Sequence, residues 1–325
     1  MEKTKRPFWQ KILIVLCVIL IVSTCFTIST KYIRFKKIEE ILVTVENDET
    51  NLSNSTIKNI SELIEVDKEY KTFEENYLQA ILYSSNGEYE KALEAYDKTL
   101  TLCQTDNEKE KVCFSKGIYY VSNLEYANAI EEFTNVLDIN KDNAKALIYR
   151  ADSYLQLQQY DKALEDINVY CKNNTLNETQ YETVITVYLG LGDYENAITY
   201  ETKAIESGYN DEQFVLYRLQ TYLMLNKFDE AKEDCVTYSE LVNEDIDPEI
   251  VMATSLYSLQ KYEKALEVYS TYLNDHDDLS VYDEAIQCSY EYDDYEKMLE
   301  LSINALAICE DEMILRLLIN GKLLR

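Results

Sequence analysis

A short motif recurs along the chain at a nearly constant interval. It consists of an aromatic residue, two further residues and an alanine, and successive alanines are 37 residues apart once and 34 residues apart four times. A period of 34 residues is the length of one helix–turn–helix unit. The interval therefore predicts a stack of helical hairpins. The copies are Tyr89/Ala92, Tyr126/Ala129, Tyr160/Ala163, Tyr194/Ala197, Phe228/Ala231 and Tyr262/Ala265, followed by Tyr295 with Met298 in the alanine place.

The composition favours helices over strands. Proline and glycine break helices most strongly, and the chain has only two prolines and six glycines in 325 residues. Few helix breakers remain, and there is little of the turn chemistry that β-hairpins require. We therefore expect an all-α fold.

The residues around the motif resemble the tetratricopeptide repeat family over roughly Glu69 to Leu306. The turn and second helix read GEYEKALEAY from Gly87 and QQYDKALEDI from Gln158. The resemblance implies a right-handed superhelical solenoid of helix–turn–helix repeats, about seven of them in residues 69–307. The small residue of the first helix, which lets paired helices approach closely, appears as Ala80, Gly117, Ala151 and Ala253.

The chain departs from the family pattern in two respects. The proline that closes each repeat is absent, and polar residues such as Asn143 and Asn173 stand there instead. Such residues can end one helix and cap the next. Ile185, Leu219 and Ile286 replace the small residue in three repeats, where we expect slightly wider helix pairs.

An uncharged apolar stretch occupies residues 12–30, between Lys11 and Lys31. As a helix it would measure about 28 Å, close to the hydrocarbon thickness of about 30 Å of a bilayer. It predicts a single transmembrane helix after a short basic tail (residues 1–11). A cleaved signal peptide and a lipoprotein signal ending at Cys25 are alternatives, but the basic flank after Thr30 favours a retained anchor.

Residues 31–68 are interpreted as a juxtamembrane helix and a polar spacer. Four basic residues lie on each side of the predicted span, so the positive-inside rule nearly cancels. A short basic head before a single span usually stays inside. We therefore expect a single-pass protein of the cell membrane with its repeat domain outside the cytoplasm, although free cysteines favour the opposite orientation.

The last residues, 308–325, place Met313, Ile314 and Leu317 at helical spacing with little polar face. This pattern predicts a C-terminal capping helix that covers the open core of the last repeat. An exposed segment that binds a partner is the alternative.

Charge is distributed unevenly. Residues 1–37 hold eight of the 31 Lys and Arg but one of the 60 Asp and Glu, so the remainder carries 23 positive and 59 negative charges. A body with a net charge of −36 repels a phosphate backbone, which argues against a nucleic-acid partner.

The sequence gives no sign of an enzyme, a cofactor or a metal site. Its one histidine, His276, lies in a predicted loop between repeats, and glycine-rich phosphate loops and paired-histidine zinc spacings are missing. The cysteines show no CxxC spacing, and we interpret them as small buried residues.

In the family that the chain resembles, the first helix of every repeat lines a concave surface. The resemblance therefore implies an apolar groove suited to a peptide or helix. A clamp for a terminal carboxylate is disfavoured, because Lys145 alone matches its pattern. The predicted groove residues are Tyr77, Ile81, Phe114, Ile118, Val121, Ile148, Leu155, Leu189, Leu216, Leu223, Ile250 and Tyr257.

Together these features predict a membrane-anchored scaffold that binds a polypeptide in the concave groove of the repeats. Two alternatives remain. The protein could be a structural one that self-associates as a homo-oligomer, or an accessory subunit that docks a separate enzyme.

Overall fold

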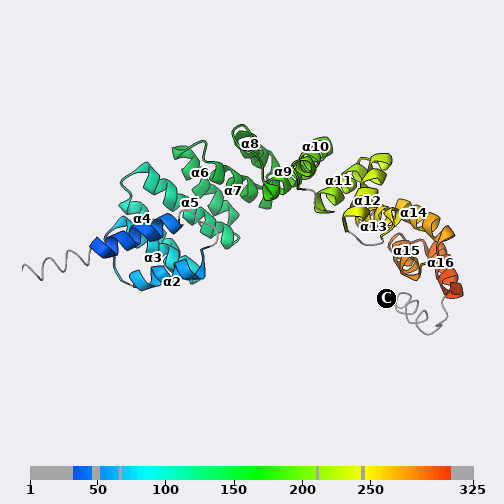
Figure 1. Cartoon of the computed structure of the whole chain (residues 1–325), viewed down its shortest axis with the longest axis horizontal. Coiled ribbons are helices and arrows are strands. Elements are labelled where there is room, and N and C mark those ends of the chain that lie inside the picture. Colours follow the sequence, from blue (N-terminus) through cyan, green and yellow to red (C-terminus); the bar gives the residue numbers. More distant parts are fainter. Residues whose placement is uncertain (1–31, 46–51, 66–67, 210–211, 243–245, 309–325) are drawn as a thin grey trace, which may run out of the picture. The chain divides into compact units, whose positions relative to one another are not determined.

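The computed structural model describes residues 32–45, 52–65, 68–209, 212–242 and 246–308, and all regular elements in these ranges are α-helices (Figure 1). This agrees with the all-α prediction. A helix covers residues 32–45 and is followed by α2 (Asn54–Leu63), α3 (Phe73–Ser85), α4 (Tyr89–Leu102), α5 (Asp106–Ser122), α6 (Tyr126–Ile139), α7 (Ala144–Gln156), α8 (Tyr160–Tyr170), α9 (Glu178–Leu191), α10 (Tyr194–Glu206), α11 (Glu212–Met224), α12 (Phe228–Val242), α13 (Pro248–Ser258), α14 (Tyr262–Asp275), α15 (Leu279–Glu291) and α16 (Tyr295–Ile308).

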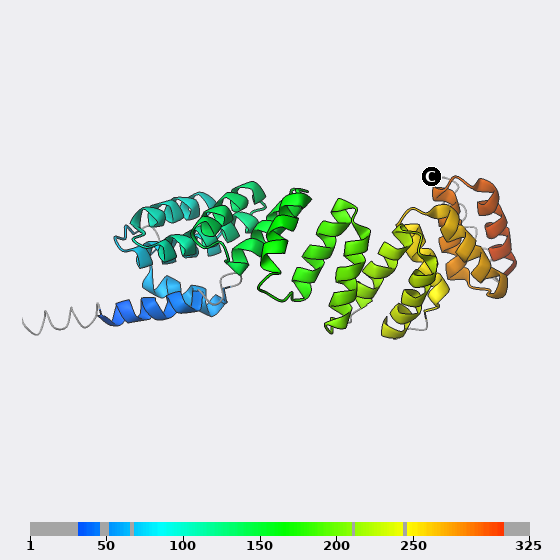
Figure 2. The same ribbon diagram turned by 90° about the horizontal axis from the view of Figure 1, so that it is seen from above.

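The chain forms two compact units, Met1–Leu157 and Gln158–Arg325. In the first unit α3 packs on α4, α5 on α6, and α6 on α7. In the second unit, consecutive helices from α8 to α16 pack on one another in the same way. Within each unit, successive helices therefore pack as helical hairpins (Figure 2).

Two predicted segments cannot be compared with this structure. Residues 12–30, the predicted span, and residues 309–325, which make up nearly all of the predicted capping helix, lie outside the described residues. Within the described ranges, no helix combines the length and the apolar character needed to cross a bilayer.

The second helix of each hairpin begins at the aromatic residue of the repeated motif. Thus α4 begins at Tyr89, α12 at Phe228 and α16 at Tyr295, and the other four second helices follow the same rule. The predicted register of the repeats is confirmed. Asn143 also caps the helix that follows it, because its side chain accepts a hydrogen bond of 2.9 Å from the backbone N–H of Ala146.

Small residues let the helices approach one another closely. The six motif alanines are completely buried, and so are Ala80, Ala151 and Ala253 of the first helices. A Cβ added to Gly117 would lie 2.7 Å from the ring of Phe133, and one added to Gly190 would lie 2.4 Å from the ring of Tyr160. Tyr160 belongs to α8 and Gly190 to α9, so the motif aromatic fills the space against the next repeat.

One left-handed residue lies at the turn inside every hairpin. In the first hairpin this is Gly87, with φ of 72°, and in the second it is Leu124, with φ of 61°. The next residue closes the first helix: the N–H of Glu125 donates to the carbonyl of Tyr120 at 2.9 Å. The remaining hairpins have Gln158, Gly192, Asn226, Gln260 and Asp293 at this position.

Replacement of Leu124 by glycine should stabilise the fold. A left-handed residue with a Cβ costs roughly 1–2 kcal/mol, and the greater flexibility of glycine in the unfolded chain offsets part of this gain. Leu124 is 72% exposed and loses little packing. We expect Leu124→Gly to raise the free energy of unfolding by up to ~1 kcal/mol in urea titrations.

Gly87→Ala is the mirror-image control, because a Cβ there would meet nothing within 4 Å and only the backbone is strained. It should lower stability by about 1 kcal/mol. Destabilisation by Leu124→Gly together with no effect of Gly87→Ala would contradict this account of the turns.

A buried ionic cluster joins α10, α11 and α12. Arg218 donates through Nε to Asp234 Oδ2 at 2.9 Å and through Nη2 to Asp234 Oδ1 at 2.7 Å. Glu201, whose side chain is completely buried, accepts a hydrogen bond of 2.8 Å from the Thr221 hydroxyl, while its Oε2 atom has no partner. Burial raises the pKa of Glu201 to about 7, against the lowering influence of Thr221 and Arg218.

This carboxyl should make stability depend on pH. The unfolded chain ionises Glu201 above its ordinary pKa of 4.5, whereas the folded chain keeps it protonated up to about pH 7. The unfolded state therefore binds fewer protons between these values, so stability falls as the pH rises from about 4.5 to about 7. From the pKa difference, the loss is on the order of 3 kcal/mol.

Glu201→Gln should remove most of this pH dependence and should be more stable than the parent chain at pH 8. Urea midpoints measured from pH 4.5 to 8 test this expectation. Glu206→Gln, at an exposed position of the same helix α10, serves as the control and should leave the profile unchanged. An unchanged profile in Glu201→Gln would show that the carboxyl is already charged in the folded state.

Candidate partner-binding surface

The twelve predicted groove residues all lie on the first helices of the hairpins. Eight are half-buried and keep some accessible apolar surface: Ile118, Val121, Ile148, Leu155, Leu189, Leu216, Ile250 and Tyr257. The other four are buried: Tyr77, Ile81, Phe114 and Leu223. The structure therefore distinguishes core positions from positions that a partner could reach.

The buried positions have internal partners. The Tyr77 hydroxyl lies 2.6 Å from the Ser115 hydroxyl on the next first helix. The ring centroid of Phe114 lies 5.7 Å from that of Phe133 and 5.8 Å from that of Tyr149. These side chains hold neighbouring hairpins together, and their role in binding a partner stays a prediction.

In the first unit, part of the predicted groove faces the chain's own N-terminal segment. Helix 32–45 and α2 lie along the first repeat (Figure 2), and Ile38, Val45 and Ile60 share one core with Tyr77 and Ile81. A cavity of about 240 Å³ remains between them. It is lined by Val45, Leu52, Ile57, Ile81, Ser84, Ser85, Tyr96, Ser115, Ile118, Tyr119 and Ser122.

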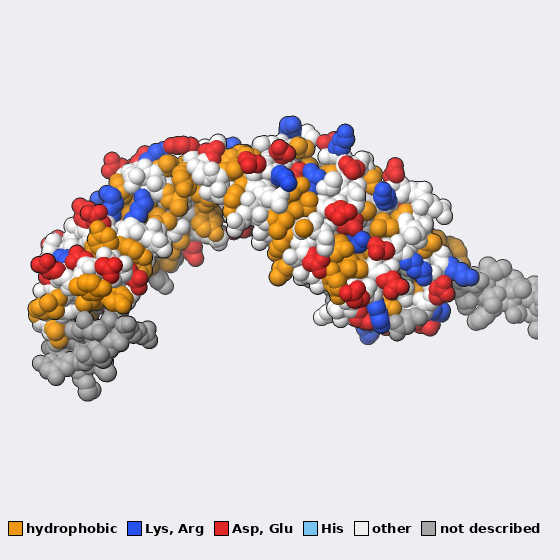
Figure 3. Space-filling view, turned by 180° about the vertical axis from the view of Figure 1, so that it is seen from behind, with side chains coloured by type: hydrophobic (Ala, Val, Ile, Leu, Met, Phe, Trp, Pro, Cys, Tyr) orange, Lys and Arg blue, Asp and Glu red, His pale blue; other side chains and the backbone are white. Residues whose placement is uncertain are grey.

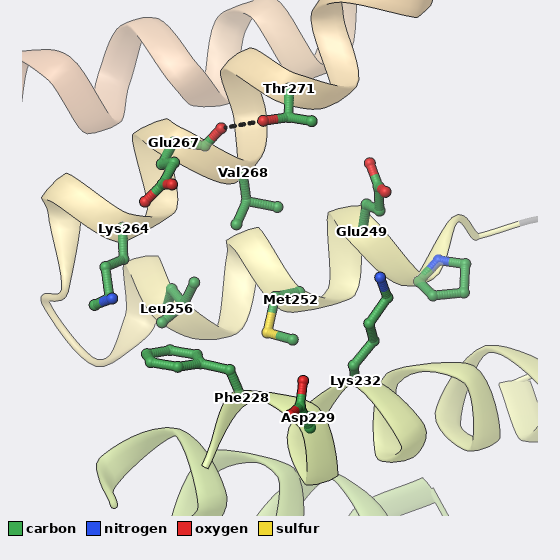
Figure 4. A pocket seen from close by; sticks show the side chains of 11 residues that line it. Phe228, Asp229, Lys232, Glu249, Met252, Leu256, Lys264, Glu267, Val268 and Thr271 are labelled. Carbon is green, nitrogen blue, oxygen red and sulfur yellow. Dashed lines mark hydrogen bonds between the residues drawn. The ribbon is translucent and has the colours of Figure 1, made fainter. Parts of the chain in front are cut away.

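The second unit contains a larger hollow of about 380 Å³ between α12, α13 and α14 (Figure 4). Its floor is apolar, with Met252 and Leu256 of α13 buried beneath it. The Lys264 ammonium lies 4.2 Å from the ring centroid of Phe228, so the rim pairs a cation with an aromatic face. The full lining is Phe228, Asp229, Lys232, Pro248, Glu249, Met252, Leu256, Lys264, Glu267, Val268 and Thr271.

The hollow combines an apolar centre with a charged rim. Figure 4 shows Phe228, Met252, Leu256 and Val268 converging, with charged side chains around them. Our prediction from the sequence placed the site on the first helices alone and missed this hollow, because α12 and α14 are second helices. The one signal for it is Phe228, which stands where the other six copies of the motif have tyrosine.

The described residues do not assemble a metal site, since no group of three or more His, Cys, Asp or Glu in them could hold an ion. Burial raises the pKa of the Cys113 and Cys235 thiols to about 12 and that of Cys288 to about 11, which makes them poor nucleophiles. His276 follows α14 and stacks on Tyr272, with ring centroids 4.2 Å apart. The three thiols are therefore packed into the core, and the His276 ring packs on a neighbouring aromatic side chain.

Comparison with known families gives two matches. Residues 77–110 and residues 114–177 each match a model described as tetratricopeptide repeat. Protein unc-45 homolog B of Danio rerio is 24% identical over 100 residues, which are 30% of this chain and 11% of that protein. The mitochondrial import receptor subunit TOM70 of Rattus norvegicus is 24% identical over 117 residues, 35% of this chain and 19% of that protein. The chain thus matches less than a fifth of the length of either relative.

Two solved structures show a partial likeness to this chain. A tetratricopeptide repeat protein from Parabacteroides merdae is 16% identical with a TM-score of 0.47, over 82% of this chain and 98% of that one. A chain in the structure of Naa15/Naa10 bound to HypK is 15% identical with a TM-score of 0.48, over 90% of this chain and 46% of that one. The family matches show tetratricopeptide repeats within residues 77–110 and 114–177, and the helical hairpins from α3 to α16 repeat the same pattern.

Proposed function

We propose that this protein is a membrane-anchored scaffold that binds a polypeptide through the first helices of its repeats. The observation that supports this most directly is the half-buried apolar row Leu189, Leu216, Ile250 and Tyr257 on α9, α11 and α13. The alanines and large apolar residues beneath already close the core. Leu189, Ile250 and Tyr257 pack on the core with one side and keep part of their apolar surface accessible, which suits an apolar partner face.

Charge narrows the class of partner. The body that follows residue 37 carries 59 acidic and 23 basic residues. A basic polypeptide would be drawn to such a surface and a nucleic acid repelled. We infer a partner segment that presents apolar side chains flanked by Lys or Arg.

The membrane anchor rests on the sequence of residues 12–30, which hold no charged residue between Lys11 and Lys31. Nineteen residues in a helix match one bilayer crossing. In the proposed arrangement the span stays in the mature chain, and the repeats lie on the extracytoplasmic side of the cell membrane.

Variants on the first helices should lose the partner without losing the fold. Leu216→Asp and Ile250→Asp place a charge in the half-buried row, and we expect partner recovery from detergent extracts to fall at least about tenfold, as for a binding hot spot. Val236→Asp on α12 is the matched control, because Val236 is an exposed apolar residue on a second helix.

Quantitative mass spectrometry of co-purified proteins measures recovery, and the melting temperature is recorded for each variant. Loss of the partner in Val236→Asp, with full recovery in the two first-helix variants, would move the site to the second helices. A melting temperature that falls in step with recovery would assign Leu216 and Ile250 to the core.

Self-association is a second candidate, supported by the last described helix. Along α16, Tyr295, Leu299 and Ile303 recur every four residues and are 56%, 59% and 55% exposed. Figure 3 shows hydrophobic side chains gathered at this end of the described chain. An exposed apolar stripe of this kind is suited to a second copy of the chain.

If the chain self-associates through α16, Leu299→Asp combined with Ile303→Asp should convert the oligomer to a monomer in light scattering of the detergent-solubilised protein. Glu296→Lys, which changes charge on the same helix outside this stripe, should leave the mass unchanged. A parent chain that is already monomeric at high concentration would exclude this function.

A further inference from the structure

The first turns of helix 32–45 expose large apolar side chains beside basic ones. Tyr32, Ile33 and Phe35 are 61%, 54% and 48% exposed. Lys36 and Lys37 are exposed next to them. We call these five residues the interfacial patch. Water is a poor environment for three large apolar side chains within four residues, so their exposure calls for a covering surface.

Folding of the first unit does not account for the patch, because a different side of the helix makes the internal contacts. Arg34 donates to the carbonyl of Leu63 at 3.2 Å and pairs with Glu75 at 3.0 Å. Ile38 and Val45 are buried in the core of the first repeat. These contacts fix the rotation of the helix and hold the patch outward.

The charge of the patch is opposite to that of the body. Between residues 31 and 37 the chain has four basic residues and no acidic one, whereas the rest of the chain after residue 37 is strongly acidic. Glu39, which pairs with Lys36 at 2.6 Å, and Glu40 then end the basic run. A surface that attracts this patch must be anionic and must also accept aromatic and aliphatic side chains.

A bilayer surface meets both requirements. Aromatic rings favour the headgroup level, and lysines near anionic headgroups each contribute about a fivefold gain in affinity. The position of the patch in the chain agrees with this, because the uncharged residues 12–30 end two residues before Tyr32. The first turn of a helix that follows a span this closely stays near the membrane surface.

We propose that the interfacial patch lies on the anionic surface of the bilayer and holds the first unit at a fixed orientation to it. This inference rests on the proposed membrane anchor, which supplies the proximity. In it, Arg34 is the positioning residue that turns the patch toward the lipid, and Ile33, Phe35 and Tyr32 enter the headgroup region.

The test uses the full chain reconstituted into vesicles of phosphatidylcholine alone or with added phosphatidylglycerol. An environment-sensitive fluorescent amino acid replaces Ile33 in one sample and Val236 of α12, an exposed control site, in another. We expect a shift of emission to shorter wavelength at position 33, larger with phosphatidylglycerol, and no shift at position 236.

Charge reversal adds a second control. Lys36→Glu combined with Lys37→Glu should abolish the added effect of phosphatidylglycerol at position 33. Lys71→Glu combined with Lys109→Glu makes the same change of net charge at other exposed lysines and should leave it intact. Equal emission at positions 33 and 236, or equal effects of the two double variants, would overturn the proposal.

Alkaline carbonate washing of the same vesicles tests the anchor independently. A chain that resists the wash but shows no shift at position 33 keeps its anchor and refutes the patch. A chain that washes off, yet shifts at position 33 when bound in neutral buffer, supports the patch and refutes the anchor.

Discussion

Close approach of neighbouring helices is the constraint on which the rest of this structure depends. Ala92, Ala129 and the other motif alanines are completely buried, and any larger side chain there would separate the hairpins. Gly117 and Gly190 extend the same rule, because the rings of Phe133 and Tyr160 occupy the space where a Cβ would stand. Because these contacts recur with a period of 34 residues, each hairpin packs on the next in the same way.

The hairpin register could be predicted from sequence because it depends on local signals. An aromatic residue after a turn appears seven times, six times with an alanine three residues later, and all seven second helices begin at that aromatic. The left-handed turn positions could be predicted in part, because glycine favours this conformation and occupies two of them, Gly87 and Gly192. Leu124 and Gln260 adopt the same left-handed conformation, which their residue types do not predict.

The binding surface was less predictable because it depends on how hairpins stack. Tyr77 and Leu223 occupy groove positions by family resemblance, yet both are buried, since contacts between neighbouring hairpins decide which side of a first helix is covered. The packing of helix 32–45 against the first repeat was equally hidden, because that segment lacks the repeat period. The hollow around Met252 is formed by three helices of two hairpins, and its one signal in the sequence is Phe228 in place of the motif tyrosine.

We propose that a polypeptide binds the first helices of the repeats. Hydrogen–deuterium exchange of the chain, with and without a cross-linked partner recovered from the membrane, tests it most directly. A partner on the first helices should slow exchange in α9, α11 and α13, which carry Leu189, Leu216 and Ile250. Protection confined to α10, α12 and α14 would contradict it.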